Sequence, residues 1–211
     1  MSSSELVRRR RGIGGRVAFC VCGPSGAGKT SVIKAVMADL PGLAFSVSYT
    51  TRPKRAGETD GVDYCHIARD AFEQLISNGD LVEHVTYSGH LYGTSRRQIE
   101  TVLERGDDLV LNVDVEGART LKRCGLAAEC DVVYVFLMPS SLERLGERLR
   151  RRGSEDEARI ATRLAVAARE IKELSWFDYL VVNDTFDVAV DELRSIIVAE
   201  RARIRGHDAR D

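Results

Sequence analysis

The sequence has almost no excess charge and no long apolar run. Its 31 Lys and Arg residues balance 32 Asp and Glu residues, which leaves a formal net charge of −1. Bulk charge therefore gives no reason to expect a nucleic acid or a membrane as the main partner. No stretch of the 211 residues reaches the apolar length that a membrane-spanning helix requires. The hydrophobic fraction of 44% is ordinary for a soluble globular protein.

Lysine and cysteine are both scarce. Only 5 of the 31 basic residues are lysines, so a lysine inside a motif is more informative than one of the 26 arginines. The five cysteines form no regular framework, which predicts free thiols in a reducing compartment and a cytoplasmic location. Cys20 and Cys22 lie inside an apolar run with no second pair at zinc spacing, so we interpret them as small residues of a buried strand.

Residues 1–15 are predicted to form a flexible basic tail. Arg8–Arg11 and the apolar residues after them faintly resemble a secretion signal, but Gly14, Gly15 and Arg16 interrupt that stretch, so we do not expect secretion. An RNA-binding role for the tail is disfavoured, because the sequence lacks aromatic stacking motifs and a readable basic face.

Short apolar runs alternate with longer stretches of helical periodicity. The runs are continuous, as in strands that are buried on both faces of a parallel sheet. The predicted strands are Val17–Cys22, Leu109–Val113, Val132–Leu137 and Tyr179–Val182. The predicted helices after them are Thr30–Asp39, Val115–Cys124, Ser140–Arg151 and Val188–Ile204. This order predicts an α/β fold with helices on both faces of a parallel sheet.

Two regions interrupt this alternation. Residues 44–94 are predicted to form an inserted, partly antiparallel subdomain between two core segments, 16–43 and 95–206. Its expected elements are the extended segments Val62–Ile67, Leu81–Tyr87 and His90–Tyr92, the helix Asp70–Asn78 and a tight turn at Ser88-Gly89. A charge-dense stretch at about residues 150–160 lies between two helices and is predicted to be a mobile lid.

A phosphate-binding loop follows the first predicted strand and opens the first predicted helix. It is Gly23-Pro24-Ser25-Gly26-Ala27-Gly28-Lys29-Thr30, which fits the pattern G-x-x-x-x-G-K-[ST]. The glycines let several backbone N–H groups point at one phosphate, and the helix N-terminus adds partial positive charge. Lys29 can reach the β- and γ-phosphates, and the Thr30 hydroxyl can ligate Mg²⁺. The loop predicts a P-loop NTPase-type core but does not choose among kinases, GTPases and ATPases.

The segments that follow resemble the signature of guanylate kinases. The first is Ser46-Val47-Ser48-Tyr49-Thr50-Thr51-Arg52-Pro53-Lys54-Arg55-Ala56-Gly57-Glu58, followed by Gly61 and Asp63-Tyr64. The resemblance continues at Glu83, Ser88-Gly89, Tyr92-Gly93-Thr94, Asn112-Val113-Asp114, Arg148 to Gly153, Arg163 and Asn183-Asp184. It covers the chain from about Val17 to Ile204. It implies an α/β core, a GMP-binding subdomain and a lid, and transfer of the γ-phosphoryl group of ATP to GMP, and to dGMP, with Mg²⁺.

The resemblance also implies roles for individual residues. For the GMP phosphate they are Arg52, Arg55, Tyr64 and Tyr92, and for guanine they are Ser48, Glu83, Thr94 and Asp114. Glu58 and Gly93 belong to the same motifs and are predicted to be part of the GMP site. The residues implied to act on the transferring phosphoryl group are Lys29, Arg52, Arg148, Arg152 and Arg163. Arg148 is also implied to stack on adenine, and Asn183 to lie near the adenine pocket.

These residue types suit the chemistry. Two arginine forks with phenol donors fit a monophosphate dianion. One carboxylate, Glu83, can accept from both N1–H and the N2 amine of guanine, whereas adenine would leave it unpaired. The acceptor phosphate is mostly deprotonated at neutral pH, because its second pKa is near 6, so no general base is needed. Catalysis then reduces to in-line positioning and neutralisation of charge.

One position departs from the family pattern. Guanylate kinases usually carry Asp or Glu where this chain has Asn112, two residues before Asp114. A carboxylate there could support the Mg²⁺ water shell or orient Arg52, and the amide keeps the shape without the charge. The departure therefore bears on Mg²⁺ use more than on the reaction itself.

Two alternatives remain open on the sequence alone. One is a related kinase with another phosphorylated acceptor, against which Glu83, Ser48 and Thr94 argue. The other is a guanylate-kinase-like module that binds phosphorylated peptides and has lost catalysis, against which the intact Lys29 and Thr30 argue. The expected partners are GMP and ATP, and the chain is expected to be a monomer or a homodimer.

Overall fold

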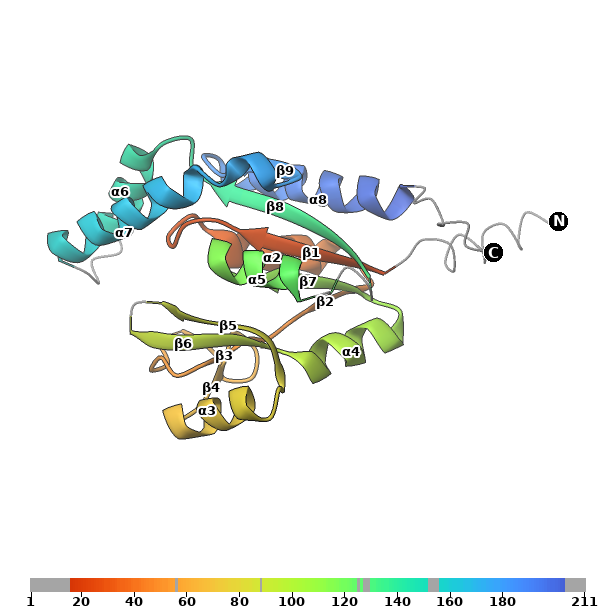
Figure 1. Ribbon diagram of the computed structural model, residues 1–211. Helices are drawn as coiled ribbons and strands as arrows, with labels where there is room; N and C mark the ends of the chain where they lie inside the picture. The colour runs from red at the N-terminus through yellow and green to blue at the C-terminus, as the bar shows by residue number, and fades with distance from the viewer. Residues whose placement is uncertain are drawn as a thin grey trace, which may run out of the picture.

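The computed structural model describes residues 16–55, 57–87, 89–124, 126, 130–151 and 156–203. Two β-sheets and the helices that cover them account for most of these residues (Figure 1). In chain order, the elements are β1 (Val17–Cys22), α2 (Lys29–Asp39), β2 (Leu43–Phe45), β3 (Tyr49–Thr50), β4 (Cys65–His66), α3 (Arg69–Ser77), β5 (Leu81–Tyr87), β6 (His90–Ser95), α4 (Arg96–Arg105), β7 (Asp108–Asn112), α5 (Val115–Arg123), β8 (Asp131–Met138), α6 (Leu142–Arg151), α7 (Glu157–Ile171), the 3-10 helix η2 (Leu174–Trp176), β9 (Tyr179–Val182) and α8 (Phe186–Ala202).

The larger sheet has five parallel strands in the order β2-β7-β1-β8-β9. Every residue of β1 is buried, because helices cover both faces of the sheet. Val17, Phe19 and Val21 pack with α2 and α8 on one face. Ala18 and Cys20 pack with α4 and α5 on the other face. The predicted α/β fold with a P-loop NTPase-type sheet is therefore confirmed.

The smaller sheet has four strands in the order β4-β3-β6-β5. Strands β3 and β4 are parallel, whereas β6 is antiparallel to both β3 and β5. Helix α3 covers one side, where Phe72 packs with Leu81 and Leu91. Gly89 has the positive φ of 81° that a two-residue hairpin loop demands, while Ser88 lies outside the described residues. The inserted, partly antiparallel sheet matches the prediction, and the limits 44–94 stay a prediction.

Two connections join the smaller sheet to the larger one at the same edge (Figure 1). The chain leaves the larger sheet after β2 and returns to the neighbouring strand β7 through α4. The backbone N–H of Val47, in the first connection, donates to Oε1 of Gln98, in α4, at 3.0 Å. The two connections are therefore held side by side.

Helices α6 and α7 pack against each other beyond the carboxyl ends of the parallel strands (Figure 1). Their contact buries Leu145 and Leu149 of α6 with Ile160 and Ala167 of α7. The predicted lid, at about residues 150–160, includes the end of α6 and the start of α7, which an ion pair between Arg150 and Glu157 joins. Residues 152–155 of that lid lie outside the described residues, as does the predicted tail, 1–15.

The predicted strand Val62–Ile67 is too long, because a turn occupies its first half. The carboxylate of Asp63 accepts from the backbone N–H of Thr59, and Gly61 N–H donates to the carbonyl of Tyr64. Only Cys65–His66 are extended. The last helix, predicted over Val188–Ile204, begins at Phe186 and ends at Ala202.

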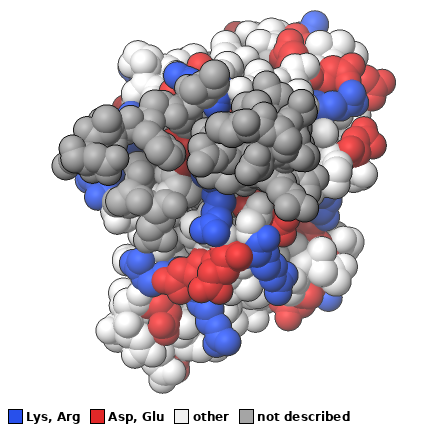
Figure 2. Space-filling view, turned by 90° about the vertical axis from the view of Figure 1, so that its right-hand side faces the viewer, with Lys and Arg blue, Asp and Glu red and all other residues white. Residues whose placement is uncertain are grey.

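The described surface is electrostatically mixed. On the face shown in Figure 2, Lys and Arg side chains are interspersed with Asp and Glu side chains. This mixture agrees with the formal net charge of −1. None of the helices in the described part of the chain has the length and apolar character needed to cross a membrane.

Candidate functional site

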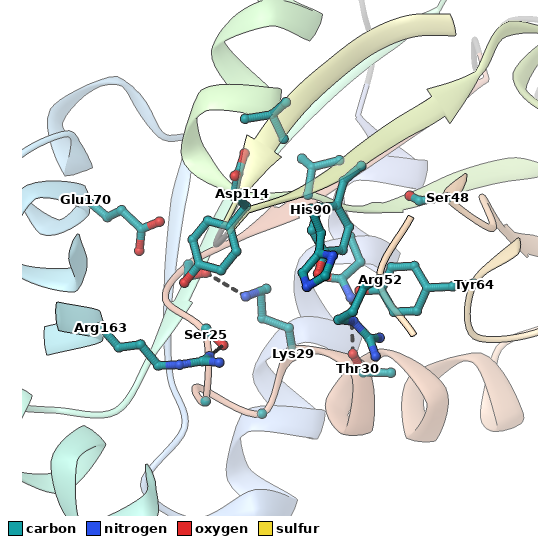
Figure 3. Close-up of a pocket in the computed structure, with 18 of the residues that line it drawn as sticks. Ser25, Lys29, Thr30, Ser48, Arg52, Tyr64, His90, Asp114, Arg163 and Glu170 are labelled. Atoms are coloured by element: carbon teal, nitrogen blue, oxygen red, sulfur yellow. Dashed lines mark hydrogen bonds between the residues drawn. The ribbon is translucent and has the colours of Figure 1, made fainter. Parts of the chain in front are cut away.

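A cavity of about 1060 Å³ lies between the phosphate loop, the smaller sheet and α7 (Figure 3). Residues from all three bodies line it. The predicted site residues that line it are Gly23, Ser25, Gly26, Gly28, Lys29, Thr30, Ser48, Arg52, Arg55, Tyr64, Glu83, Tyr92, Asp114 and Arg163. The structure therefore brings together residues that are up to 140 positions apart in the chain.

The phosphate loop connects β1 to α2, and its backbone demands glycine. Gly23, Gly26 and Gly28 have φ angles of 132°, 97° and 97°, in the region that favours glycine. A Cβ on Gly23 would lie 2.0 Å from the carbonyl oxygen of Leu137. The curled loop leaves its N–H groups at the N-terminus of α2, where they can bind an anion.

Lys29 is folded back onto its own loop. Its ammonium donates to the carbonyl of Gly23 at 2.5 Å and to that of Pro24 at 3.2 Å. Thr30, in the first turn of α2, accepts a hydrogen bond at 3.1 Å from Nδ2 of Asn112, at the end of β7 (Figure 3). Asn112, which differs from the family pattern, therefore lies directly beside the Thr30 hydroxyl, which the sequence predicts to be a Mg²⁺ ligand.

Arg148 and Asn183 lie behind the loop rather than in the main cavity. Both donate to the carbonyl of Ala27, Asn183 at 2.7 Å and Arg148 at 3.3 Å. Arg148 also donates to the carbonyl of Asn183 and lines a second hollow of about 250 Å³ with Gly26 and Gly28. The two side chains connect the last turn of α6 and the end of β9 to the loop.

The smaller sheet presents a basic and aromatic cluster to the cavity. Arg52 is 7% exposed, and its guanidinium donates to Oε1 of Glu58 at 2.7 Å. It lies 5.3 Å from the centre of the Tyr64 ring, which contacts Tyr92 edge to face. Burial alone would raise the pKa of Glu58, but the hydrogen bond from Arg52 and the backbone N–H of Arg55 lower it. Glu58 is therefore an anion that holds the guanidinium of Arg52 and the backbone of Arg55.

A buried carboxyl group stands at the inner end of the cavity. Glu83 is 4% exposed, and its Oε1 accepts from the hydroxyl of Thr94 at 2.5 Å. Its Oε2 is buried and has no hydrogen-bond partner among the described residues. Burial raises the pKa of Glu83 to about 7, because the Thr94 hydroxyl offsets burial only in part and Asp114 adds a second negative charge. Ser48, 8% exposed, lines the same cavity.

Asp114 lies at the N-terminus of α5. Its Oδ1 accepts from the backbone N–H of Gly117 at 2.7 Å, which is a helix-capping bond. Burial raises the pKa of Asp114. Gly117 leaves space for the neighbouring carboxyl, because a Cβ there would lie 3.0 Å from Oε2 of Glu83.

Some predicted site residues support the cavity without lining it. Gly93 lets β6 pass close to β5 and α3, since a Cβ would lie 2.8 Å from Leu81 and 2.9 Å from Phe72. Thr94 holds the carboxyl group of Glu83, and Glu58 holds the guanidinium of Arg52, by hydrogen bonds. Arg152 lies outside the described residues.

Polar residues that were not predicted also line the cavity, among them Tyr87, His90, Arg159 and Glu170. Tyr87 lies four positions after Glu83 on β5, and period-two alternation places both side chains on one face. Glu170 lies seven positions after Arg163 on α7, which is two helical turns. Burial raises the pKa of Glu170 to about 7 despite the positive charge of Lys29.

Comparisons with known proteins identify one family. The family described as guanylate kinase matches residues 16–200. The guanylate kinase of Geobacter metallireducens is 44% identical over 187 residues, which are 89% of this chain and 90% of that protein. The guanylate kinase of Thermotoga maritima is 42% identical over 186 residues, which are 88% of each chain. The crystal structure of guanylate kinase from Anaplasma phagocytophilum is similar with a TM-score of 0.72 and 29% identity, covering 90% of this chain and 88% of that one.

Proposed function

Because this chain belongs to the guanylate kinase family, whose members phosphorylate GMP with ATP, we propose that it transfers the γ-phosphoryl group directly and in line, with Mg²⁺. GMP and dGMP are the proposed acceptors. No covalent enzyme intermediate is needed, since the acceptor phosphate is itself a nucleophilic dianion. The observation that carries this assignment is the unpartnered Oε2 of Glu83, buried in a cavity that also contains a phosphate loop.

The carboxyl of Glu83 supports guanine recognition. A buried acceptor without a partner costs free energy until a donor arrives, so ligands with matching donors are selected. Guanine offers N1–H and the N2 amine on adjacent positions. Thr94 holds one carboxyl oxygen, which leaves the other directed to the ligand. The Ser48 hydroxyl would donate to the O6 acceptor of guanine, where adenine carries an amine, while the Thr94 hydroxyl keeps its hydrogen bond to Glu83.

The arginine and tyrosine cluster supports binding of the GMP phosphate. Arg52 and Arg55 would supply forked donors, and Tyr64 and Tyr92 would add phenol donors. Glu58 keeps the guanidinium of Arg52 in place at 2.7 Å before the ligand arrives. Such preorganisation reduces the entropy that ordering of a long side chain would otherwise cost on binding.

The phosphate loop supports binding of the ATP phosphates. We propose that Lys29 turns from the carbonyls of Gly23 and Pro24 toward the β- and γ-phosphates. Arg163 would then neutralise charge on the transferring group from α7, together with Arg52 and Arg152. Arg148 is proposed to contact the donor nucleotide from the second hollow, with Asn183 next to adenine.

The polar groups around Thr30 suit the binding of Mg²⁺. In phosphoryl-transfer sites, Mg²⁺ takes few protein ligands and fills its remaining positions with water and phosphate oxygens. The Thr30 hydroxyl with the neutral amide of Asn112 at 3.1 Å suits that mode. The described residues hold no group of three His, Cys, Asp or Glu side chains that could enclose a metal on its own. Bound Mg²⁺ would neutralise charge on the β- and γ-phosphate oxygens.

A cytoplasmic location and a monomeric or homodimeric state complete the proposal. The five cysteines are all free thiols, which suits a reducing compartment. The oligomeric state is checked by the mass of the purified chain in solution.

A coupled assay tests the proposed function. The purified chain is incubated with ATP, Mg²⁺ and, in turn, GMP, AMP, CMP and UMP, and ADP production is followed. Transfer to GMP at least about 100-fold more efficient than to AMP is expected, because a polar mismatch at a buried site discriminates strongly. Lys29→Met is the control, since it keeps the side-chain length, removes the charge and should abolish most transfer. Transfer to AMP as efficient as to GMP would contradict the assignment of Glu83.

A further inference from the structure

Three carboxyl groups line the cavity from three elements, namely Glu83 on β5, Asp114 at the N-terminus of α5 and Glu170 on α7. The negative charge of Asp114 raises the pKa of both Glu83 and Glu170. Asp114 is therefore close enough to both carboxyl groups to interact with each of them electrostatically. Asp114 and Glu170 both interact electrostatically with Lys29, the lysine of the phosphate loop.

Glu170 enters the cavity from α7. Figure 3 shows its carboxyl group pointing from that helix toward Lys29 and Asp114. Its Oε2 is buried and has no hydrogen-bond partner among the described residues. Buried polar atoms in folded proteins almost always have a partner, so an orphan oxygen in a ligand cavity indicates that the partner arrives with the ligand.

The chemistry of the two nucleotides limits what that partner can be. Phosphate groups only accept hydrogen bonds and repel a carboxylate, whereas bases and ribose hydroxyls donate. The donors of guanine are already matched by Glu83 in the proposed function. The ribose of a nucleoside monophosphate connects its base to its phosphate. In the proposed function Asp114 contacts the guanine base and Lys29 the transferring phosphoryl group, and the carboxyl group of Glu170 points toward both residues (Figure 3).

We propose that Glu170 accepts hydrogen bonds from the ribose hydroxyls of the acceptor nucleotide and thereby favours GMP over its deoxy forms. The inference rests on the proposed function, because it assumes that GMP occupies this cavity. It assigns to α7 a substrate contact in addition to Arg163. Both residues lie on one face of the helix, seven positions apart, so one movement of α7 would bring both to the substrates.

The test compares three acceptors that differ only in their hydroxyl groups: GMP, dGMP and 2′,3′-dideoxy-GMP. Their kcat/KM values are measured for the unmodified chain and for Glu170→Ala. The substitution should lower kcat/KM about 10- to 100-fold for GMP, as expected for a hydrogen bond to a charged group. The loss should be smaller for dGMP and less than about 3-fold for the dideoxy nucleotide.

Glu170→Gln refines the result, because the amide keeps one acceptor oxygen without the charge. Its kcat/KM for GMP should fall between those of the unmodified chain and Glu170→Ala. Glu100→Gln, at an exposed position of α4, is the matched control and should change no kcat/KM value. Thermal unfolding of each variant checks folding, and neither change at Glu170 should lower the melting temperature, since each removes a charged carboxylate whose Oε2 is buried without a hydrogen-bond partner among the described residues.

Two results would overturn the inference in different ways. An equal loss with all three acceptors would mean that Glu170 acts through Lys29 and not through the ribose. No transfer from ATP to GMP by the unmodified chain would overturn the proposed function itself, and the assignment of Glu170 with it.

Discussion

Asn112 lies at the end of β7, and its amide donates to the hydroxyl of Thr30 at 3.1 Å. Asn112→Asp would place a negative charge beside the proposed Mg²⁺ ligand with almost no change in volume. The Thr30 hydroxyl can reverse its role and donate to the new carboxylate, so the contact is kept. We expect the apparent Mg²⁺ requirement of GMP phosphorylation to fall about 5-fold, since two charges at contact in a wet site interact by about 1 kcal/mol.

Titration of activity against Mg²⁺ measures this change. The difference should disappear at saturating Mg²⁺, because only metal occupancy is altered. Asn78→Asp adds the same charge at the exposed end of α3 and should leave the requirement unchanged. An unchanged Mg²⁺ requirement combined with slower turnover in Asn112→Asp would instead assign the amide a purely structural role.

Glu83 couples ligand selection to stability. Its folded-state pKa of about 7 is higher than its ordinary value of 4.5, because the carboxyl is buried. Between these two values the folded chain binds more protons than the unfolded chain, so this group's contribution to stability is lost as pH rises from 4.5 through 7. Glu83→Gln resembles the protonated form at every pH. Its free energy of unfolding at pH 8 should exceed that of the unmodified chain by up to about 3 kcal/mol.

Denaturant unfolding at pH 5 and at pH 8 tests this prediction. The advantage of Glu83→Gln should shrink toward pH 5, while Glu100→Gln should match the unmodified chain at both values. The same variant should phosphorylate GMP poorly, because its amide meets the guanine donors with a donor of its own. A variant that is less stable at pH 8 would show that the carboxyl is not destabilised by its burial.

Among individual residues, the sequence predicted most of the cavity lining and missed Glu170. Motif residues such as Arg52 and Glu83 were found because their spacing matches a family signature. Glu170 belongs to no such signature, and a glutamate near the end of a polar helix is ordinarily solvent-exposed. The only signal was its spacing of seven from Arg163. That spacing is informative only once α7 is known to face the phosphate loop.

Among the elements, the phosphate loop is fixed from behind by β9 and α6. The loop residue Gly28 has a φ of 97°, and a Cβ there would lie 2.4 Å from Nδ2 of Asn183. Gly28→Ala should therefore both strain the backbone and break the bond from Asn183 to the Ala27 carbonyl. We expect a loss of about 2–4 kcal/mol in the free energy of unfolding.

Gly79→Ala separates the two causes. Gly79 also has a positive φ, 73°, but nothing lies within 4 Å of its Cβ position. Backbone strain alone should cost about 1 kcal/mol there. Both values come from denaturant unfolding of the two variants. Equal losses would mean that the contact with Asn183 contributes nothing to holding the loop.

The secondary structure shows which elements the sequence pattern predicts and which it misses. The four longest core strands were predicted within one residue at each end, because a parallel strand buried on both faces is apolar throughout. Helix α4 was not predicted. It follows β6 without a break, since Ser95 ends the strand and also caps the helix, and it buries only Ile99 and Leu103. Strand β2 was missed because three half-buried residues carry too little pattern.

For the whole molecule, the cavity between three bodies implies a change of shape on binding. The proposed substrates would bridge the smaller sheet, the phosphate loop and α7, and attraction of phosphates to Lys29, Arg52 and Arg163 would draw the three together. Small-angle scattering should show a smaller radius of gyration with a bisubstrate analogue that joins adenosine and guanosine through phosphates.

An analogue with adenosine at both ends is the control, because it lacks the donors that Glu83 selects. It should leave the radius of gyration close to that of the free chain. If the guanosine analogue binds tightly and the radius of gyration is unchanged, the three bodies already have their final arrangement, and closure plays no part in the reaction.

The hydrogen bond between Val47 and Gln98 has a consequence for the direction of any such motion. A body held by one tether can swivel about three axes, but one held by two adjacent tethers keeps a single easy rotation, about the line through both. The smaller sheet crosses to the larger one twice, at neighbouring strands, and the crossings are fastened to each other. Its swing therefore follows an arc whose axis the covalent chain determines. Ligand binding can therefore change how far the smaller sheet rotates, while the two connections determine the axis of that rotation.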